Sequence, residues 1–135
     1  MAVKNFKELV VWQKSMELTL IIYHLVKHFP KEEMYALTNQ ICRAAVSIPS
    51  NIAEGQGRQS KAEFLNFLSI ANGSLAEVET QLLIAIKLGY IQEADAQYAQ
   101  NLITQIGKML NTIRSRLTTD HCLLTTNLSP LLTNH

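Results

Sequence analysis

The stretch that decides the fold is QICRAAVSIPSNIAEGQGR, residues 40–58, because it carries two separate stripes on one helical projection. Apolar side chains recur here at steps of three or four residues, which is the spacing of a helix face buried in a bundle. We therefore predict a long helix with one face in a core. The apolar stripe, continued toward the preceding proline, consists of Met34, Leu37, Ile41, Ala44, Ile48 and Ile52.

A polar stripe lies about 100 to 140° away on the same helical wheel. Short hydrogen-bonding side chains, two Arg and one Glu take the place of the Lys and Glu that are typical of a solvated face. We interpret this stripe as fitted to a partner surface rather than to water. Its members are Gln40, Arg43, Ser47, Asn51 and Glu54, with Arg58 next if the helix continues.

The length and charge of the chain limit what kind of protein it is. A chain of 135 residues fits one domain that buries about two-thirds of its unfolded surface without a disulfide or a metal. Its 12 Lys and Arg against 11 Asp and Glu leave a formal charge of +1, which excludes a strongly polycationic surface. Any binding of nucleic acid must then come from local patches of cations, or from patches repeated by symmetry.

Targeting and redox signals favour a soluble cytoplasmic protein. Cys42 and Cys122 are far apart and belong to no paired-cysteine motif, so we expect reduced thiols. The opening residues MAVKNFKELVVWQKS lack the basic start, apolar run and cleavage site of a secretory signal. Because no run of 18 apolar residues occurs, we expect no membrane partner.

Few breaks interrupt the helical pattern, since the chain has only three prolines and five glycines. Short connections between long helices force neighbours to run antiparallel, so we expect an all-α, antiparallel up-down-up-down four-helix bundle as one domain over residues 1–117. We expect the tail, residues 118–135, to be disordered or loosely docked. The helices are expected at about residues 10–28, 31–54, 60–88 and 92–117.

Individual residues mark the ends of these helices. Pro30 separates the first two, and Ser60 with Glu63 forms a capping box that opens the third. Gly89 ends the third helix as a left-handed residue. Inside the second helix, Pro49 removes a backbone donor and clashes with the carbonyl four residues earlier, which predicts a kink.

Two helices carry more apolar surface than one bundle core needs. On the first helix, one stripe runs from Trp12 to Val26 and a second lies about 120° away. We predict that the extra faces form a subunit interface, because leaving them in water would cost several kcal/mol. A thick core, or cover from the tail, is the alternative explanation. The interface candidates are Val11, Leu18, Ile22, Leu25, Ile70, Ile84 and Leu88.

Catalytic and metal-binding motifs are not apparent. The Glu-x-x-His pairs of ferritin-like bundles are absent from the sequence. His24 and His28 lie four residues apart and could share a metal near Glu17, but two surface histidines explain the same spacing. Cys42 beside Arg43 could have a lowered thiol pKa, whereas a buried helix cysteine is more common. We predict no enzyme, no metal and no cofactor.

The GQGR turn after the decisive helix offers an alternative site. Arg58, followed by Ser60 and Lys61 at a helix start, would bring free amides and cations together around a phosphate. Ordinary turn glycines and a capped helix account for the same letters. Glu54 would also pair with Arg58 or with Arg43, within or between subunits.

Several ordered motifs, taken together, carry a resemblance to a known family. They are FKELVVWQKSMEL at residues 6–18, FPKEEMYAL at 29–37, residues 40–58, EFLNFLSIANGSLAEVETQL at 63–82 and LGYI at 88–91. With these in view, the chain resembles the bacterial four-helix-bundle family first found encoded in intervening sequences of large-subunit ribosomal RNA genes. The resemblance covers about residues 5–117.

This resemblance implies an antiparallel four-helix bundle that assembles into a ring of five subunits. It also implies kinship with the accessory protein of diversity-generating retroelements, which binds nucleic acid and reverse transcriptase, but no settled activity. Cys42 departs from the family pattern, because members commonly have a second basic residue there, and this weakens a nucleic-acid patch beside Arg43. The pattern carries over onto Gln40, Arg43, Ser47, Pro49, Asn51, Glu54, Gly55, Arg58, Ser74 and Glu77.

Two functional hypotheses follow. The first is a non-enzymatic homo-oligomer, pentameric by the resemblance, that binds structured RNA or another nucleic acid. The second is a scaffold or adaptor for a protein partner without nucleic-acid binding, in which Gln40, Ser47, Asn51 and Glu54 form a structural polar stripe. The cations assigned to binding are Arg43, Arg58, Lys61, Lys108, Arg114 and Arg116.

Overall fold

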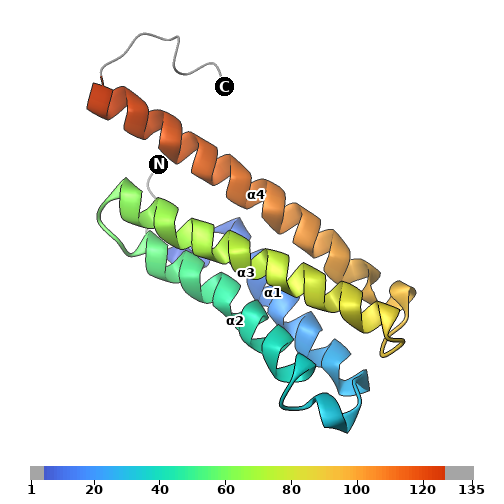
Figure 1. The fold of residues 1–135 in the computed structure, drawn as a ribbon. Coiled ribbons are helices and arrows are strands. Elements are labelled where there is room, and N and C mark those ends of the chain that lie inside the picture. Colours follow the sequence, from blue (N-terminus) through green and yellow to red (C-terminus); the bar gives the residue numbers. More distant parts are fainter. Residues whose placement is uncertain (1–4, 127–135) are drawn as a thin grey trace.

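The structure is a computed structural model that describes residues 5–126, with side chains up to Thr119. Within this range the chain forms four long α-helices and no strand (Figure 1). They are α1 (Val10–Leu25), α2 (Leu37–Gln56), α3 (Lys61–Lys87) and α4 (Glu93–Thr126), with short 3-10 helices at Phe6–Glu8, Val26–His28 and Lys31–Glu33.

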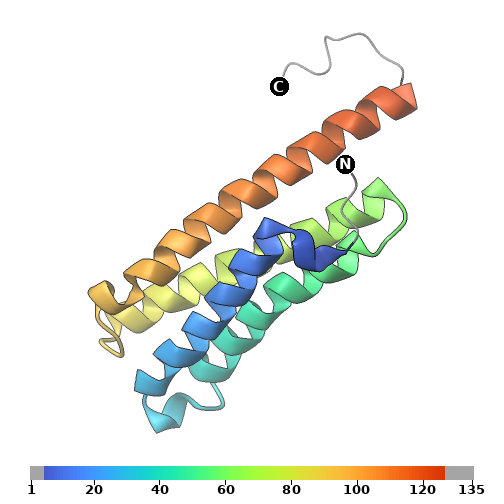
Figure 2. The ribbon, with the colours of Figure 1, turned by 180° about the vertical axis from the view of Figure 1, so that it is seen from behind.

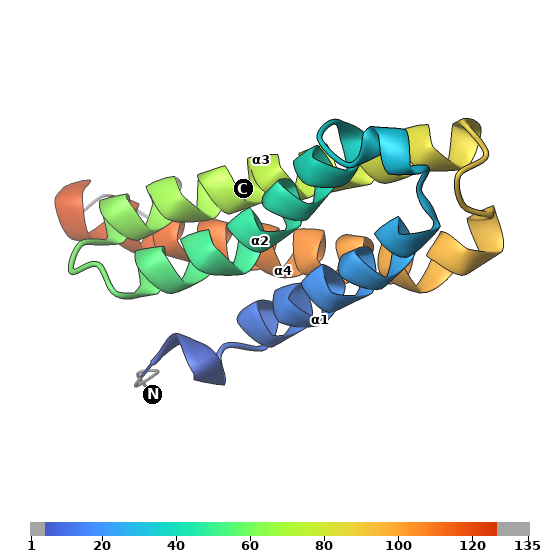
Figure 3. The same cartoon turned by 90° about the horizontal axis from the view of Figure 1, so that it is seen from below.

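Successive helices run antiparallel and lie side by side, and α1 also packs against α4. The view from behind shows α1 across the middle of the bundle (Figure 2), and the view from below shows the α1–α2 and α3–α4 connections at one end (Figure 3). The α2–α3 turn lies at the other end. The predicted all-α, antiparallel up-down-up-down four-helix bundle is confirmed.

The buried face of α1 is not the one that its sequence pattern predicted. The four interface candidates on this helix are buried within the single chain, whereas Met16, Leu20 and Tyr23 are 39%, 62% and 47% exposed. The assignment of these four residues to a subunit interface was therefore wrong. Their face of α1 lies in the core, and the other apolar face of the helix is the exposed one. The buried four are Val11, Leu18, Ile22 and Leu25.

Two small polar residues explain this difference. Ser15 and Thr19 lie on the buried face of α1, where they interrupt its apolar pattern. Ser15 Oγ donates to the carbonyl of Trp12 at 2.9 Å, and Thr19 Oγ1 lies 2.8 Å from the carbonyl of Ser15. Because backbone carbonyls satisfy both hydroxyls, these side chains can be buried without an unpaired polar group.

The second helix begins later than predicted. Residues 31–33 form a 3-10 helix, and α2 starts only at Leu37, so Met34 lies outside the core and is 52% exposed. Glu33 accepts a hydrogen bond from the backbone N–H of Leu37 at 3.2 Å and so caps the new start. In the rest of the predicted stripe, Leu37 is half-buried, and Ile41, Ala44, Ile48 and Ile52 are buried as expected.

The proline inside α2 is compensated by a neighbouring helix. Pro49 has no N–H, so the carbonyl of Ala45 loses its usual partner within the helix. Thr19 Oγ1 of α1 lies 3.1 Å from that carbonyl, so its one hydroxyl proton is shared between the carbonyls of Ser15 and Ala45. The contact links α1 to α2 at the point where the helix ladder is interrupted.

The predicted ends of α3 are confirmed. Ser60 Oγ accepts a hydrogen bond from the backbone N–H of Glu63 at 3.1 Å, and the Ser60 hydroxyl also contacts the Glu63 carboxylate. At the other end Gly89 has a φ of +80°. Its N–H donates to Ile86, and the N–H of the following Tyr90 donates to Ala85, which is the pattern of a Schellman C-cap.

The last helix is longer than predicted. It continues to Thr126 rather than ending near Leu117, so the first part of the expected tail is helical. Residues 127–135, the rest of that tail, lie outside the described residues. In Figure 1 the final turns of α4 extend past the α2–α3 turn.

Two tyrosine–carboxylate hydrogen bonds tie α4 and its preceding loop to the first half of the chain. Tyr90 donates to Glu33 at 2.7 Å, which joins the two connections at one end of the bundle. Tyr98 of α4 donates to Glu17 of α1. These hydrogen bonds to carboxylates are the main reason why the pKa of each tyrosine is raised.

The helices α2 and α3 approach closely at Gly55, which belongs to α2 rather than to the predicted turn. A Cβ atom at this position would lie 2.7 Å from Phe67 Cβ and 2.9 Å from Phe64 Cδ1 on α3. Only a residue without a side chain fits there without moving one of the helices. Gly73, in the middle of α3, has open space instead.

We predict that Gly55→Ala and Gly73→Ala have opposite effects on stability. Gly55→Ala should lower the free energy of unfolding by about 1–3 kcal/mol, because the new methyl group overpacks the α2–α3 contact. Gly73→Ala, the matched control, should raise it by about 0.4–1 kcal/mol by restricting the unfolded chain. Urea unfolding followed by circular dichroism measures both values. A Gly55→Ala variant as stable as Gly73→Ala would contradict the close approach.

Candidate nucleic-acid interface

The middle of the polar stripe faces α3 of the same chain. Ser47 Oγ lies 2.7 Å from Ser74 Oγ on α3. Asn51 Nδ2 donates to the carbonyl of Ser47 at 2.8 Å and to its Oγ at 2.9 Å. Ser47 therefore contacts the neighbouring helix, and Asn51 bonds to Ser47 within α2, so the three side chains form one hydrogen-bond network inside the chain.

One turn before this network, the two helices border an open polar groove with a volume of about 380 Å³. Arg43 on the α2 wall and Glu77 on the α3 wall are both exposed. The side chain of Gln81 is half-buried, and its Oε1 is buried without a hydrogen-bond partner. Gln40, Ala44 and Ser47 complete the α2 wall, and Ser74 completes the α3 wall. This groove, hereafter the α2–α3 groove, combines charged and amide groups that have no described partner.

The end of the stripe lies at the α2–α3 turn and pairs within the chain. Arg58 Nη2 and Glu54 Oε2 are 2.8 Å apart, which confirms one of the two pairings considered for Glu54. The Arg58 guanidinium also lies over the ring of Phe67, 4.9 Å from its centroid. Arg58 is thus held in place by a carboxylate and an aromatic face while it remains exposed.

The turn itself is already engaged in helix capping. Ser60 Oγ accepts the Glu63 N–H, and the N–H of Arg58 donates to the carbonyl of Gly55. Two backbone donors that a phosphate would use are therefore satisfied by the chain. This favours the capped-helix interpretation of the GQGR segment over an anion site formed by amides.

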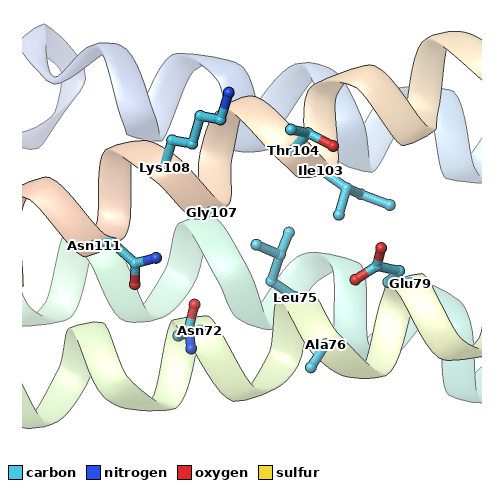
Figure 4. A pocket seen from close by; sticks show the side chains of 9 residues that line it. All are labelled: Asn72, Leu75, Ala76, Glu79, Ile103, Thr104, Gly107, Lys108 and Asn111. Atoms are coloured by element: carbon cyan, nitrogen blue, oxygen red, sulfur yellow. The ribbon is translucent and has the colours of Figure 1, made fainter.

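The cations of α4 lie on a different helix but toward the same end. Lys108 borders an open groove of about 320 Å³ between α3 and α4, together with Asn72 and Asn111. Figure 4 shows the two amides facing each other across this groove, while the Lys108 side chain points away from them. Arg114 and Arg116 follow on the last described part of α4, where Arg114 is half-buried and Arg116 is exposed.

Charge is distributed unequally along the bundle, although the sequence is almost neutral. The half that contains the α2–α3 turn holds seven described cations against three carboxylates, a formal surplus of +4. The other half holds four described cations against seven carboxylates, a formal charge of −3. The first half, hereafter the basic half, contains the cations Lys7, Lys14, Arg58, Lys61, Lys108, Arg114 and Arg116 and the carboxylates Glu8, Glu54 and Glu63.

Five of the six predicted binding cations lie in the basic half, and Arg43 lies outside it. Sequence reasoning missed Lys7 and Lys14, because they are far from Arg58 along the chain and reach the same half only through the antiparallel path of α1. Their position followed from the predicted topology, since the start of α1 and the α2–α3 turn share one end of an up-down bundle.

Exposed apolar side chains form the remaining unusual surface. The predicted interface residues Ile70, Ile84 and Leu88 of α3 are 44%, 42% and 56% exposed. On α1 the exposed apolar residues are Val10, Met16, Leu20 and Tyr23, above all Leu20 at 62%. An apolar groove of about 410 Å³ also lies between the start of α1 and α4, bordered by Leu9, Val10, Met109 and Ile113.

Other candidate chemistry finds little support in the described residues. His24 and His28 are exposed, and no group of three or more potential metal ligands occurs in the part of the chain that the structure describes. Burial raises the pKa of the Cys42 thiol, which works against a reactive thiolate. None of the described helices has the length and apolar character needed to cross a membrane.

Comparisons with known proteins agree with this fold. A family model described as 23S rRNA-intervening sequence protein matches residues 7–112. Among solved structures, the chain is similar to a protein of unknown function from the S23 ribosomal protein family of Bacteroides thetaiotaomicron. The two share 34% sequence identity with a TM-score of 0.72, over 78% of this chain and 98% of that chain. The search of curated proteins found no match.

We predict that Asn51→Leu lowers the free energy of unfolding by about 1–2 kcal/mol, because it removes two hydrogen bonds at a half-buried position. Asn39→Leu, at an exposed position on the same helix, is the control and should change stability by less than about 0.5 kcal/mol. Thermal unfolding measures both. Equal melting temperatures for Asn51→Leu and the parent protein would remove the structural role of the network.

Proposed function

Since this chain belongs to the 23S rRNA-intervening sequence protein family, we propose that it is a non-enzymatic, cytoplasmic homo-oligomer that binds structured RNA through its basic half. The unequal distribution of charge along the bundle is the observation that carries this proposal. A surplus of +4 on one half offers phosphate contacts that the net charge of +1 conceals.

The cations of the basic half come from three α-helices, one 3-10 helix and one turn, so they can follow a folded RNA surface rather than one groove. Arg58 is held by Glu54 and Phe67, which reduces the side-chain freedom that it would lose on contact with a phosphate. Arg114 and Arg116 extend the patch along α4. Phosphate contacts of this kind make the affinity fall steeply as salt rises.

Assembly into a homo-oligomer is supported by the apolar side chains that the single chain leaves exposed. Leu20 with Met16 and Tyr23 on α1, and Ile84 with Leu88 on α3, lie on surfaces that no described residue covers. Burying them against identical copies would recover hydrophobic free energy. The family resemblance implies five copies, and a ring would repeat each cation of the basic half by symmetry.

We predict that the double variant Arg114→Ala with Arg116→Ala binds a folded fragment of 23S rRNA more weakly than the parent protein. The slope of log affinity against log salt should decrease by about 0.7–0.9 for each phosphate that the variant no longer neutralises. Filter binding at several salt concentrations measures this slope. The matched control is Lys27→Ala with Lys31→Ala, which removes the same charge from the other half and should leave the slope unchanged.

Binding that is insensitive to salt, or a control pair that weakens it as much as the α4 pair, would reject the basic half as the RNA-binding surface. Absorbance at 260 nm in the purified protein would add direct support for a bound nucleic acid. These outcomes do not depend on the number of subunits.

We predict that Leu20→Glu shifts the protein toward single chains. Light scattering should give the parent protein a mass that is a multiple of 15.2 kDa, and five times this value for a pentamer. A buried glutamate at a subunit contact would be unpaired, which opposes assembly. Gln105→Glu, at an exposed position on α4, is the control and should leave the mass unchanged. A parent protein that scatters as one chain at micromolar concentration contradicts the oligomer.

A scaffold or adaptor for a protein partner is the second candidate, and the apolar groove between α1 and α4 favours it. Its walls of Leu9, Val10, Met109 and Ile113 offer an apolar surface to a partner side chain. Co-purification of a stoichiometric protein without nucleic acid would support this function over RNA binding.

A further inference from the structure

The contact between Ser47 and Ser74 fixes the register of α2 against α3 along the α2–α3 groove. Because α2 and α3 run antiparallel, residues before Ser47 lie opposite residues after Ser74. At about 1.5 Å of rise per residue, Arg43 lies about 6 Å from Ser47 along the axis, and Glu77 lies about 4.5 Å from Ser74 in the same direction. Arg43 and Glu77 therefore stand at nearly the same level on opposite walls.

These two opposite charges do not neutralise each other. Neither Arg43 nor Glu77 forms an ion pair or hydrogen bond with any described residue, although both border one groove. Arg43 thus presents its fork of N–H donors, and Glu77 presents two carboxylate oxygens as acceptors. A ligand placed between them must offer acceptors on one edge and donors on another.

Gln81 is a third side chain of this groove with a hydrogen-bonding atom that has no described partner. It lies one turn beyond Glu77 on the same wall. Its Oε1 is buried and has no donor among the described residues. Buried side-chain acceptors in folded proteins are nearly always hydrogen-bonded, so an unpaired one on a groove wall indicates a missing donor. If the amide were turned around, its N–H₂ group would take the same position and would also lack a partner.

Among the nucleobases, guanine offers the matching pattern. Its O6 and N7 are adjacent acceptors that fit the donor fork of an arginine, which is the commonest specific contact to this base. Its N1–H and N2–H₂ are adjacent donors that fit the two oxygens of a carboxylate, and the second N2 hydrogen remains for an amide oxygen. Adenine, cytosine and uracil do not present both an acceptor pair and a donor pair.

We propose that the α2–α3 groove binds the base of an unpaired guanosine, with Arg43 on O6 and N7 and with Glu77 and Gln81 on the N1–H and N2–H₂ edge. This site rests on the proposed RNA-binding function and adds base selectivity to it. RNA-binding proteins generally read bases that are splayed out of single-stranded loops. The groove volume of about 380 Å³ lies within the range of small-ligand sites, about 300–1,000 Å³.

The test compares two single-stranded RNAs, each nine nucleotides long. In both, uridines flank a central nucleotide, which is guanosine in one RNA and inosine in the other. Inosine lacks the N2 amine and keeps every other group. The parent protein should bind the guanosine RNA about 10-fold more tightly, the effect of removing part of a two-bond base contact. Glu77→Gln should reduce this preference, because an amide cannot accept from both N1–H and N2–H₂, while the Gln81 oxygen still accepts from N2–H₂. Glu79→Gln, a carboxylate on the neighbouring groove, should retain it.

The possible results separate this site from the proposed function. Salt-sensitive binding of both RNAs with equal affinity keeps the RNA-binding function and rejects the guanosine site. A preference that Glu77→Gln leaves undiminished also rejects it. Binding of neither RNA, nor of the folded fragment, rejects both proposals. A change of mass in light scattering for Glu77→Gln would show that the groove is a contact between copies, and this too rejects the guanosine site.

Discussion

The close contact between α2 and α3 sets the geometry of the α2–α3 groove and of the turn that carries Arg58. Gly55 allows α2 to approach Phe64 and Phe67 more closely than any residue with a Cβ atom would. Ser47 and Ser74 then set the register of the two helices about two turns away. With distance and register fixed, the groove walls face each other, and Arg58 is held against the ring of Phe67 at the turn. A small shift of either helix would disturb all of these arrangements together.

Buried polar groups in this bundle are arranged so that an interruption on one helix is compensated by another. Pro49 leaves a carbonyl without its helical donor, and Thr19 on α1 supplies a hydroxyl to it. Ser15, on the same face of α1, bonds within its own helix. These contacts specify which face of α1 meets α2, since an aliphatic residue in place of Thr19 would leave the Ala45 carbonyl unpaired. Gln81 is the exception, because no described group satisfies its buried oxygen.

The sequence predicted the architecture well because helix spacing, caps and connection lengths are local properties. The Ser60 cap and the left-handed Gly89 appeared where their residue types required them. The faces of α1 were assigned wrongly, because periodicity counts Ser15 and Thr19 as polar and cannot show that backbone carbonyls satisfy them. For the candidate site, the residue types in the polar stripe were predicted. The split between a structural network and an open groove was not, since it depends on the register of α3.

The unequal charge of the two halves gives the bundle an electric moment along its long axis. A polyanion that approaches such a molecule exerts a torque on it before any contact is made, and turns the basic half toward itself. At physiological ionic strength this alignment acts only over about 8 Å, the Debye length. If the subunits of a ring stand parallel, their moments add, and one rim of the assembly becomes positive while the opposite rim becomes negative. A near-neutral chain would then acquire, through assembly alone, two faces that attract opposite kinds of molecule.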